Sequence, residues 1–157
     1  MHPTAERVAA ALRAAGAPGE VRELDESAHT AAEAAAALGV PVGAIVKSLV
    51  FTADGAPVLV LASGDHQVDT TAVAAVLGVS TVKRADADVV RAATGFAIGG
   101  VAPLGHPQPL TAVVDEHLAT FPVLWAAAGT PRTVFATSYD ELLRISGGTP
   151  AEIGAGR

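Results

Sequence analysis

The chain contains no cysteine among its 157 residues. This absence excludes disulfide bonds, thiolate zinc centres and a cysteine nucleophile. Aromatic residues make up only 4% of the chain, too few for a surface that stacks the bases of single-stranded nucleic acid. No apolar run approaches the roughly 18 residues of a membrane-spanning helix, and the N-terminal residues MHPTAERVAA lack the pattern of a secretory signal. We therefore expect a cytoplasmic protein with no membrane partner.

Basic residues are also scarce. Ten Lys and Arg stand against 16 Asp and Glu, which gives a formal net charge of −6. This balance argues against a broad nucleic-acid-binding surface, but it allows a small pocket for one end of a nucleic acid. Half of the residues are hydrophobic, so the chain is not disordered. Its length predicts one domain over residues 1–157 with a sizeable core.

Helix signals recur along the chain. Thr30 with Glu33, and Ser138 with Glu141, have the spacing of capping boxes, and glycines follow both predicted helices, at 30–38 and 138–144. Three more helices are predicted at 3–15, with Thr4 as the cap, at 70–77, with Asp69 or Thr70 as the cap, and at 86–94, with Asp86 as the cap. Together these signals predict five helices separated by β-rich segments.

Two β-rich runs, 46–51 and 57–63, flank Asp54-Gly55 and predict a β-hairpin. The second run is continuously apolar, so we expect it to be buried on both faces. Further strands are predicted at 21–24, 81–84, 96–101, 110–114, 121–127 and 133–136. Because strands and helices interleave without strict alternation, the pattern favours an α+β fold with a mixed sheet that is curled or closed.

Lys47 is one of only two lysines and stands inside the apolar run IVKSLVF. Such a lysine more commonly extends its ammonium group to solvent from a sheet edge. The alternative is a lysine that projects into a pocket, where it can bind phosphate or polarise a carbonyl group. The residues alone leave both interpretations open.

Gly99 and Gly100 lie near the end of the predicted strand at 96–101, where two adjacent glycines need a structural or functional reason. One interpretation is a bulge or tight turn. The other is the close approach of a ligand to backbone N–H groups that act as an oxyanion hole. Asp65 is a candidate acid in a polar turn. The five histidines show no metal-binding spacing, so we predict neither a metal site nor a cofactor.

Several ordered segments resemble the YbaK/EbsC family. These are TAAEAAAALGVPVGAIVKSLVF (30–51), VLVLASGDH (58–66), ATGFAIGGVAPLGH (93–106), VDE (114–116) and AAGTP (127–131). The resemblance extends from about Ala5 to Ile153. That family also comprises the editing domain of bacterial prolyl-tRNA synthetase and the free-standing Cys-tRNA(Pro) and Ala-tRNA(Pro) deacylases.

The resemblance implies a barrel-like mixed sheet surrounded by helices and a metal-independent aminoacyl-tRNA deacylase. Its substrate would be tRNA(Pro) mischarged with a small amino acid, of the Ala or Cys class. The implied catalytic residues are Lys47, Gly99 and Gly100; the implied substrate-binding residues are Ser63, Gly64, Asp65 and Gly129. The implied partners are the tRNA acceptor end and prolyl-tRNA synthetase.

One departure from the family pattern concerns Ala128-Gly129-Thr130, where some members have Ser-Gly-Gly. A serine role therefore does not transfer to this chain. Two alternative functions stay open: a non-catalytic protein that binds a nucleotide or aminoacyl-tRNA, and a regulator that binds the synthetase. Arg84, Arg91 and Arg132 are candidate basic residues at the rim of the site.

Overall fold

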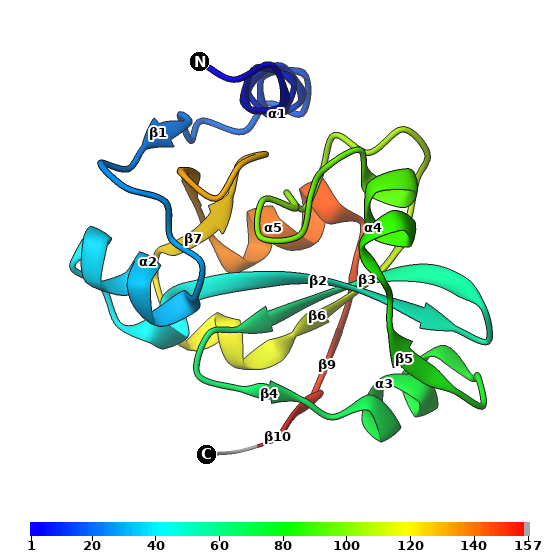
Figure 1. The fold of residues 1–157 in the computed structure, drawn as a ribbon. Coiled ribbons are helices and arrows are strands. Elements are labelled where there is room, and N and C mark those ends of the chain that lie inside the picture. The colour runs from blue at the N-terminus through cyan, green and yellow to red at the C-terminus, as the bar shows by residue number, and fades with distance from the viewer. Residues whose placement is uncertain (156–157) are drawn as a thin grey trace.

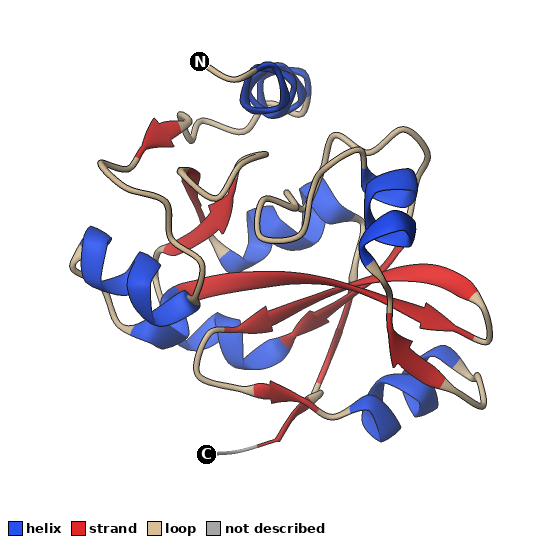
Figure 2. Ribbon diagram, in the orientation of Figure 1, coloured by secondary structure: helices blue, strands red, loops and turns tan. Residues whose placement is uncertain are grey.

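The computed structural model describes residues 1–155, which fold around one mixed β-sheet (Figures 1 and 2). The five α-helices are α1 (Pro3–Ala14), α2 (Ala31–Leu38), α3 (Thr70–Leu77), α4 (Ala87–Thr94) and α5 (Tyr139–Ser146), with 3-10 turns η1 (Val42–Ala44) and η2 (Glu116–Thr120). The strands are β1 (Arg22–Glu23), β2 (Ile45–Ala53), β3 (Ala56–Ser63), β4 (Gln67–Val68), β5 (Val82–Arg84), β6 (Thr111–Asp115), β7 (Leu124–Ala127), β8 (Thr133–Thr137), β9 (Thr149–Ala151) and β10 (Gly154–Ala155).

The main sheet has the strand order β1-β8-β7-β2-β3-β6-β9, and β5 pairs with a second part of β2. The pairs β2·β3 and β7·β8 are antiparallel, whereas β2·β7, β3·β6 and β6·β9 are parallel. A separate two-stranded sheet joins β4 to β10. The predicted mixed sheet is confirmed, with β1 and β9 at the two ends of the pairing order.

The central hairpin β2–β3 forms as predicted. Asp54 has φ 48° and Gly55 has φ 90°, the left-handed conformations of a tight hairpin turn. The Asp54 carboxylate also accepts hydrogen bonds from the N–H groups of Ser80 and Thr81, at 3.2 and 2.9 Å. The turn is therefore tied to the segment that leads into β5.

The predicted capping residues are confirmed for four helices. Thr30 accepts a hydrogen bond from Glu33 N–H, and Ser138 accepts one from Glu141 N–H. Asp69 caps α3 and Asp86 caps α4. The cap predicted for the first helix is wrong: the imidazole of His2 accepts the N–H of Thr4, because the helix already begins at Pro3.

The largest error of the sequence-based assignment is the strand at 96–101, which is a loop in the structure. The loop starts where Gly95, with φ +77°, ends α4, and Gly99 has φ +92°. These left-handed conformations are incompatible with an extended strand. The Phe96 side chain is 1% exposed and anchors the start of the loop in the core.

The strand predicted at 121–127 is shorter, because the 3-10 turn η2 and a bend at 122–123 precede β7. The short strands β4, β9 and β10 were not predicted. They contain two or three residues each, which is too few for a recognisable period. Residues 1–155 contain no helix long and apolar enough to cross a membrane.

The core lies on both faces of the sheet. Leu59 and Leu61 of β3 pack with α1, α4 and α5 residues on one face, and Val58 and Val60 pack with α3 on the other. Residues 58–62 are each at most 5% exposed, which confirms the prediction that this strand is buried on both faces. β2 lies beside this strand, so its side chains are held by a rigid central layer.

Candidate active site

A cavity of about 840 Å3 opens where the sheet splits beside β2. The first residues of β2, Ile45 and Val46, pair with β7, whereas residues 51–53 pair with β5. Residues 47–50 therefore border the cavity on the side facing away from β3. The cavity also contacts α2, the turn after β3, the 96–101 loop and the turn at Thr130-Pro131.

Lys47 lines this cavity. The side chain is half-buried, and its ammonium group donates a hydrogen bond to the backbone carbonyl of His66 in the turn after β3. Of the two interpretations of the sequence, the structure thus favours the pocket over a lysine that extends to solvent. A positive charge fixed at a cavity wall can stabilise an anion there.

The two predicted glycines have different environments. Gly99 lines the cavity and is exposed, and an added Cβ would meet only Pro131 Cγ, at 3.7 Å. Gly100 is buried, its N–H donates to the carbonyl of Ala97 at 3.0 Å, and an added Cβ would lie 2.8 Å from Thr130 Cα. The expectation that both glycines offer N–H groups to a ligand is therefore corrected: the Gly100 N–H closes a turn, and Gly99 is the glycine at the wall.

The turn after β3 contributes three of the predicted substrate-binding residues. Gly64 and Asp65 line the cavity. Gly64 packs so tightly that an added Cβ would lie 2.2 Å from the Val42 carbonyl oxygen. Ser63 is fully buried behind the wall, and its hydroxyl donates to Gly43 O at 2.6 Å and Asp65 Oδ1 at 2.8 Å. Its position supports the turn rather than direct contact with a ligand.

Gly129 is the fourth predicted substrate-binding residue, and the structure places it outside the cavity wall. Its φ is +102°, and an added Cβ would lie 2.6 Å from the carbonyl oxygen of Thr4. The Thr4 hydroxyl donates to Gly129 O at 2.8 Å. Gly129 therefore lets α1 approach the β7–β8 turn, and the neighbouring Thr130 and Pro131 are the cavity residues.

The three arginines predicted at the rim lie in different places. Arg84 lines the cavity, with its guanidinium 5.7 Å from the centre of the Phe51 ring. Arg132 instead donates from Nε to the carbonyl of Leu24 at 2.7 Å. Arg91 does not belong to the described cavity wall.

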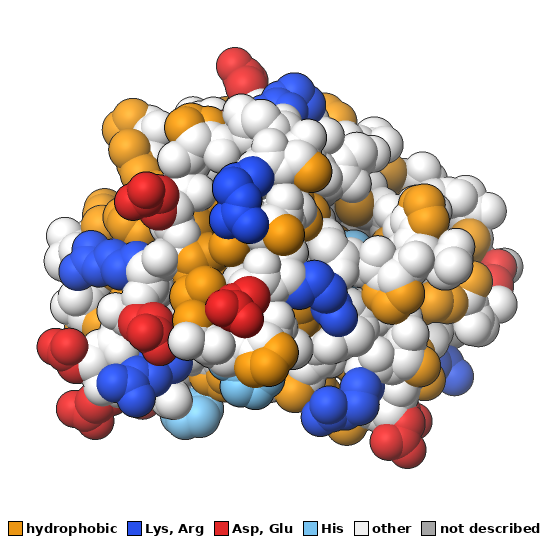
Figure 3. Space-filling model, turned by 90° about the horizontal axis from the view of Figure 1, so that it is seen from above, with side chains coloured by type: hydrophobic (Ala, Val, Ile, Leu, Met, Phe, Trp, Pro, Cys, Tyr) orange, Lys and Arg blue, Asp and Glu red, His pale blue; other side chains and the backbone are white. Residues whose placement is uncertain are grey.

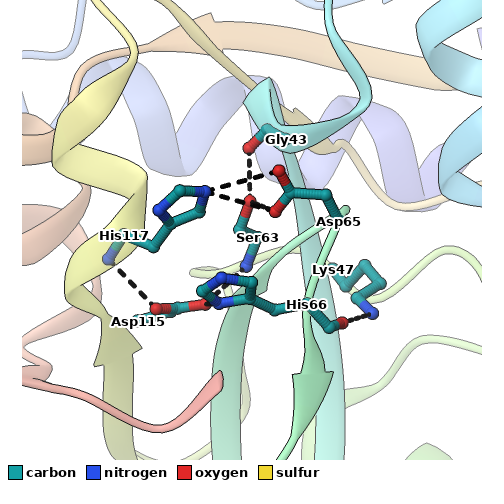
Figure 4. Close-up of polar contacts among 7 residues, drawn as sticks. All are labelled: Gly43, Lys47, Ser63, Asp65, His66, Asp115 and His117. Atoms are coloured by element: carbon teal, nitrogen blue, oxygen red, sulfur yellow. Dashed lines mark hydrogen bonds and ion pairs between the residues drawn. The ribbon is translucent and has the colours of Figure 1, made fainter. Parts of the chain in front are cut away.

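Two histidines and two carboxylates form a cluster beside Lys47 (Figure 4). His66 Nδ1 is 2.9 Å from Asp115 Oδ2, and His117 Nε2 is 3.3 Å from Asp65 Oδ1. The two imidazole rings stack with their centroids 4.2 Å apart and an interplanar angle of 20°. The cluster thus fixes the turn whose His66 carbonyl binds Lys47.

The buried Asp115 holds this arrangement together. It is 1% exposed, and its carboxylate accepts hydrogen bonds from the N–H groups of Ser63, at 3.1 Å, and His117, at 3.0 Å.

Burial tends to raise the pKa of the neighbouring Asp65 carboxyl. Hydrogen bonds from Ser63 and His117, together with the charges of His117 and His66, outweigh burial and hold that pKa below its ordinary value.

Sequence reasoning missed this cluster because it considered the spacing of histidines within single segments. The signal lies in two segments read together: Asp65-His66 follows one buried strand, and Asp115 with His117 follows another. β3 and β6 are parallel neighbours, so the residues after both strands meet at one edge of the sheet.

Ligand atoms of Asp65, His66 and His117 lie within 4.8 Å of one another, which raises the question of a metal site. The stacked rings lie in nearly parallel planes. Their in-plane lone pairs therefore do not converge on one point, as the tetrahedral coordination of zinc would require. The two histidines are stacked and each is hydrogen-bonded to a carboxylate, which does not match the tetrahedral coordination of zinc.

Comparison with known proteins gives the family of the chain. Residues 25–145 match the model of the aminoacyl-tRNA editing domain. The chain belongs to the aminoacyl-tRNA editing domain family. This confirms the resemblance found in the sequence and places the cavity, with Lys47 and Gly99 at its wall, in an editing domain.

Curated relatives of this editing domain include proline–tRNA ligases. The chain is 37% identical over 103 residues to that of Nitratidesulfovibrio vulgaris, covering 66% of this chain and 17% of the ligase. It is 36% identical over 123 residues to that of Bacillus licheniformis, covering 76% and 21%. The chain therefore matches about a fifth of the length of these ligases.

A solved structure matches the whole editing domain. It is described as a candidate trans-editing enzyme for prolyl tRNA synthetase and is 43% identical to this chain. The TM-score is 0.94, and the match covers 99% of both chains. The fold is thus that of proteins in this family.

Proposed function

We propose that this chain is a trans-editing deacylase that hydrolyses the ester between tRNA(Pro) and a small non-cognate amino acid, alanine or cysteine. The observation that carries this proposal is one cavity, in an aminoacyl-tRNA editing domain, with Lys47 and Gly99 at its wall. The full-length match to a candidate trans-editing protein supports action as a separate chain.

Ester hydrolysis develops negative charge on the carbonyl oxygen, and fixed donors stabilise that charge without reorganising. In the proposed mechanism the Lys47 ammonium supplies a positive charge for this oxyanion or for the terminal phosphate. The backbone N–H of Gly99 supplies a hydrogen-bond donor. The His66 carbonyl holds the lysine at the wall, and the histidine–carboxylate cluster holds His66.

The attacking water is proposed to be oriented by the substrate, through the ribose 2′-hydroxyl beside the ester. The mechanism is proposed to need no metal, in keeping with the near-parallel rings of His66 and His117. Hydrolysis should therefore survive exhaustive chelation. Loss of activity in EDTA that zinc restores would refute this part of the proposal.

The surface charge favours contact with the acceptor end rather than with the whole tRNA. Figure 3 shows a face on which Lys and Arg alternate with Asp and Glu around hydrophobic side chains, without a broad basic field. Because non-specific affinity scales with the number of phosphates neutralised, we propose that affinity is modest. Prolyl-tRNA synthetase is the proposed partner that would supply mischarged tRNA.

The test is a deacylation panel with tRNA(Pro) charged with Ala, Cys, Ser or Pro. The expected result is rapid hydrolysis of the alanyl or cysteinyl ester and little hydrolysis of the prolyl ester. Uniformly slow hydrolysis of all four would favour a non-catalytic binding protein. Binding to the synthetase that persists without Lys47 would favour a regulator.

A further inference from the structure

The split in the sheet leaves backbone groups of β2 directed into the cavity. The carbonyl of Val50 accepts the N–H of Ala85 at 3.1 Å, on the β5 side, whereas the carbonyl of Ile45 accepts Gly64 N–H at 2.8 Å, on the β3 side. Backbone groups alternate sides along a strand, so the N–H and C=O of Ser48 point away from β3. Within residues 1–155, pairing with β7 stops at Val46 and pairing with β5 starts at Phe51.

The side chain of Ser48 gives a second, independent observation. Its hydroxyl oxygen is buried and has no hydrogen-bond partner within the described part of the chain, and the residue lines the cavity. Buried hydroxyl groups are nearly always paired, because an unsatisfied one costs free energy. The backbone and side chain of one residue thus both offer hydrogen bonds at the same wall.

The shape of the gap restricts what can bind there. β7 closes one end and β5 closes the other, so an additional β-strand cannot run along this edge. The gap spans residues 47–50, roughly 13 Å of strand at about 3.3 Å per residue. Val50, Val90 and Val101 line the same cavity and supply apolar surface for the face of a ring. A planar group with a donor and an acceptor on one edge fits these features.

The acceptor end of a tRNA carries such a group at its terminus. The Watson–Crick edge of adenine presents the amino group at position 6 as a donor beside the N1 acceptor, and proteins read unpaired bases on this edge. Lys47 and Arg84 line the same cavity and can bind the adjoining phosphates.

We infer that the unpaired edge of β2 at Ser48 binds the Watson–Crick edge of the terminal adenine, and that the Ser48 hydroxyl contacts the same nucleoside. This inference rests on the proposed deacylase function and assigns the base-binding part of its site. It places the ester farther along the cavity wall, towards Gly99. The specificity at this position is for adenine over bases without a 6-amino donor and N1 acceptor.

The test compares alanyl-tRNA(Pro) molecules that differ in one atom of the terminal base. Purine riboside lacks the 6-amino group, 1-deazaadenosine lacks the N1 acceptor, and 7-deazaadenosine retains both as the matched control. We expect kcat/KM to fall about tenfold or more for the first two, because a buried polar group loses its partner. The control should stay within about threefold of the natural substrate.

The variant Ser48→Ala tests whether the terminal base binds beside Ser48. Because the hydroxyl has no partner in the structure, its removal should leave Tm unchanged or higher while KM rises about fivefold or more. Ser146→Ala is the matched control: its hydroxyl donates to Leu142 O at 2.6 Å, outside the cavity, so Tm should fall with KM unchanged.

Equal kcat/KM for all four tRNAs, or a wild-type KM for Ser48→Ala, would overturn the inference while the deacylase function stands. The inference would also be overturned if kcat/KM fell as much with 7-deazaadenosine as with purine riboside and 1-deazaadenosine. If the natural substrate is not hydrolysed, the proposed function fails separately. In that case the affinities of AMP and of purine riboside monophosphate are compared, with the NMR shifts of the Ser48 and Val50 amide signals as the readout. Equal affinity for the two nucleotides, or amide signals that do not move, would overturn the inference.

Discussion

Lys47 occupies a position in which local sequence and tertiary structure act together. The apolar run fixes it in the central strand β2, while the turn after β3 supplies the His66 carbonyl that binds its ammonium group. The same turn is held by His66–Asp115 and by Ser63. One cation is thereby kept at the cavity wall by residues far apart in the sequence.

Replacement of Lys47 by Ala should abolish most deacylation and leave the fold intact. Loss of a charge contact to the developing oxyanion or to the terminal phosphate is expected to cost about 2 kcal/mol or more in activation free energy, well over tenfold in rate. Single-turnover deacylation and thermal melting should be measured on the same preparation. Lys83→Ala is the control, since Lys83 is an exposed lysine of β5 outside the cavity wall. Activity of Lys47→Ala within about threefold of wild type would refute the role.

Gly100→Ala should reduce stability more than activity. The added Cβ would lie 2.8 Å from Thr130 Cα, so the two loops must separate, at a cost of about 1–3 kcal/mol. Urea unfolding and kcat/KM per folded molecule are the measurements. Gly99→Ala is the comparison: Gly99 lines the cavity, so activity per folded molecule should fall more than for Gly100→Ala, and alanine at φ +92° should also lower stability. An unchanged urea midpoint with lost activity in Gly100→Ala would contradict this assignment and return Gly100 to the catalytic residues.

Helix α1 precedes the matched editing-domain residues, yet it contacts the loop that carries Gly99. Arg7 of α1 donates from Nη2 to the carbonyl of Thr94 at 3.0 Å, and its guanidinium lies 4.3 Å from the centre of the Phe96 ring. Thr4 binds Gly129 on the neighbouring turn. The helix therefore holds both loops from outside the cavity.

Arg7→Met should loosen the 96–101 loop. The substitution removes a charged hydrogen bond and a cation–π contact, together worth about 1–2 kcal/mol. We expect a lower Tm and faster amide hydrogen exchange in the loop. Arg13→Met, which alters an exposed arginine of the same helix, should change neither. Equal exchange in the two variants would show that α1 does not stabilise the loop.

At the scale of the whole molecule, the stability of the fold should depend on pH through His106. Burial lowers the pKa of His106 below its ordinary value of 6.5; the hydrogen bond to the Ala102 carbonyl tends to raise it, and Arg7 lowers it further. The neutral form is therefore favoured in the folded state. Its contribution to stability is fully present above about pH 6.5 and is lost as pH falls through the lower folded pKa.

His106→Gln should flatten this part of the stability profile. Glutamine can still donate to the Ala102 carbonyl, which is 2.8 Å from His106 Nε2, but it does not take up a proton. Urea unfolding at several pH values between about 7.5 and 5 gives the slope for wild type and variant. A wild-type slope in His106→Gln would refute the prediction.

Several elements are predictable from signals between residues that are close together in the chain. The caps at Thr30, Asp69, Asp86 and Ser138 and the Asp54-Gly55 turn act between residues a few positions apart, so their patterns are readable without a fold. The resemblance of ordered motifs also sufficed for the family. The loop at 96–101 was misread because its residues have strand propensity, while Gly99 adopts a left-handed conformation with φ +92°.

The tertiary structure brings residues from distant segments together in one site. It paired His66 with Asp115 and separated the wall position of Gly99 from the buried turn at Gly100. It also left Ser48 at an unpaired edge, because β7 and β5 bind different parts of one strand. These features depend on which strands become neighbours. Strand pairing is fixed by burial of the whole core, so no local pattern around these residues could reveal it.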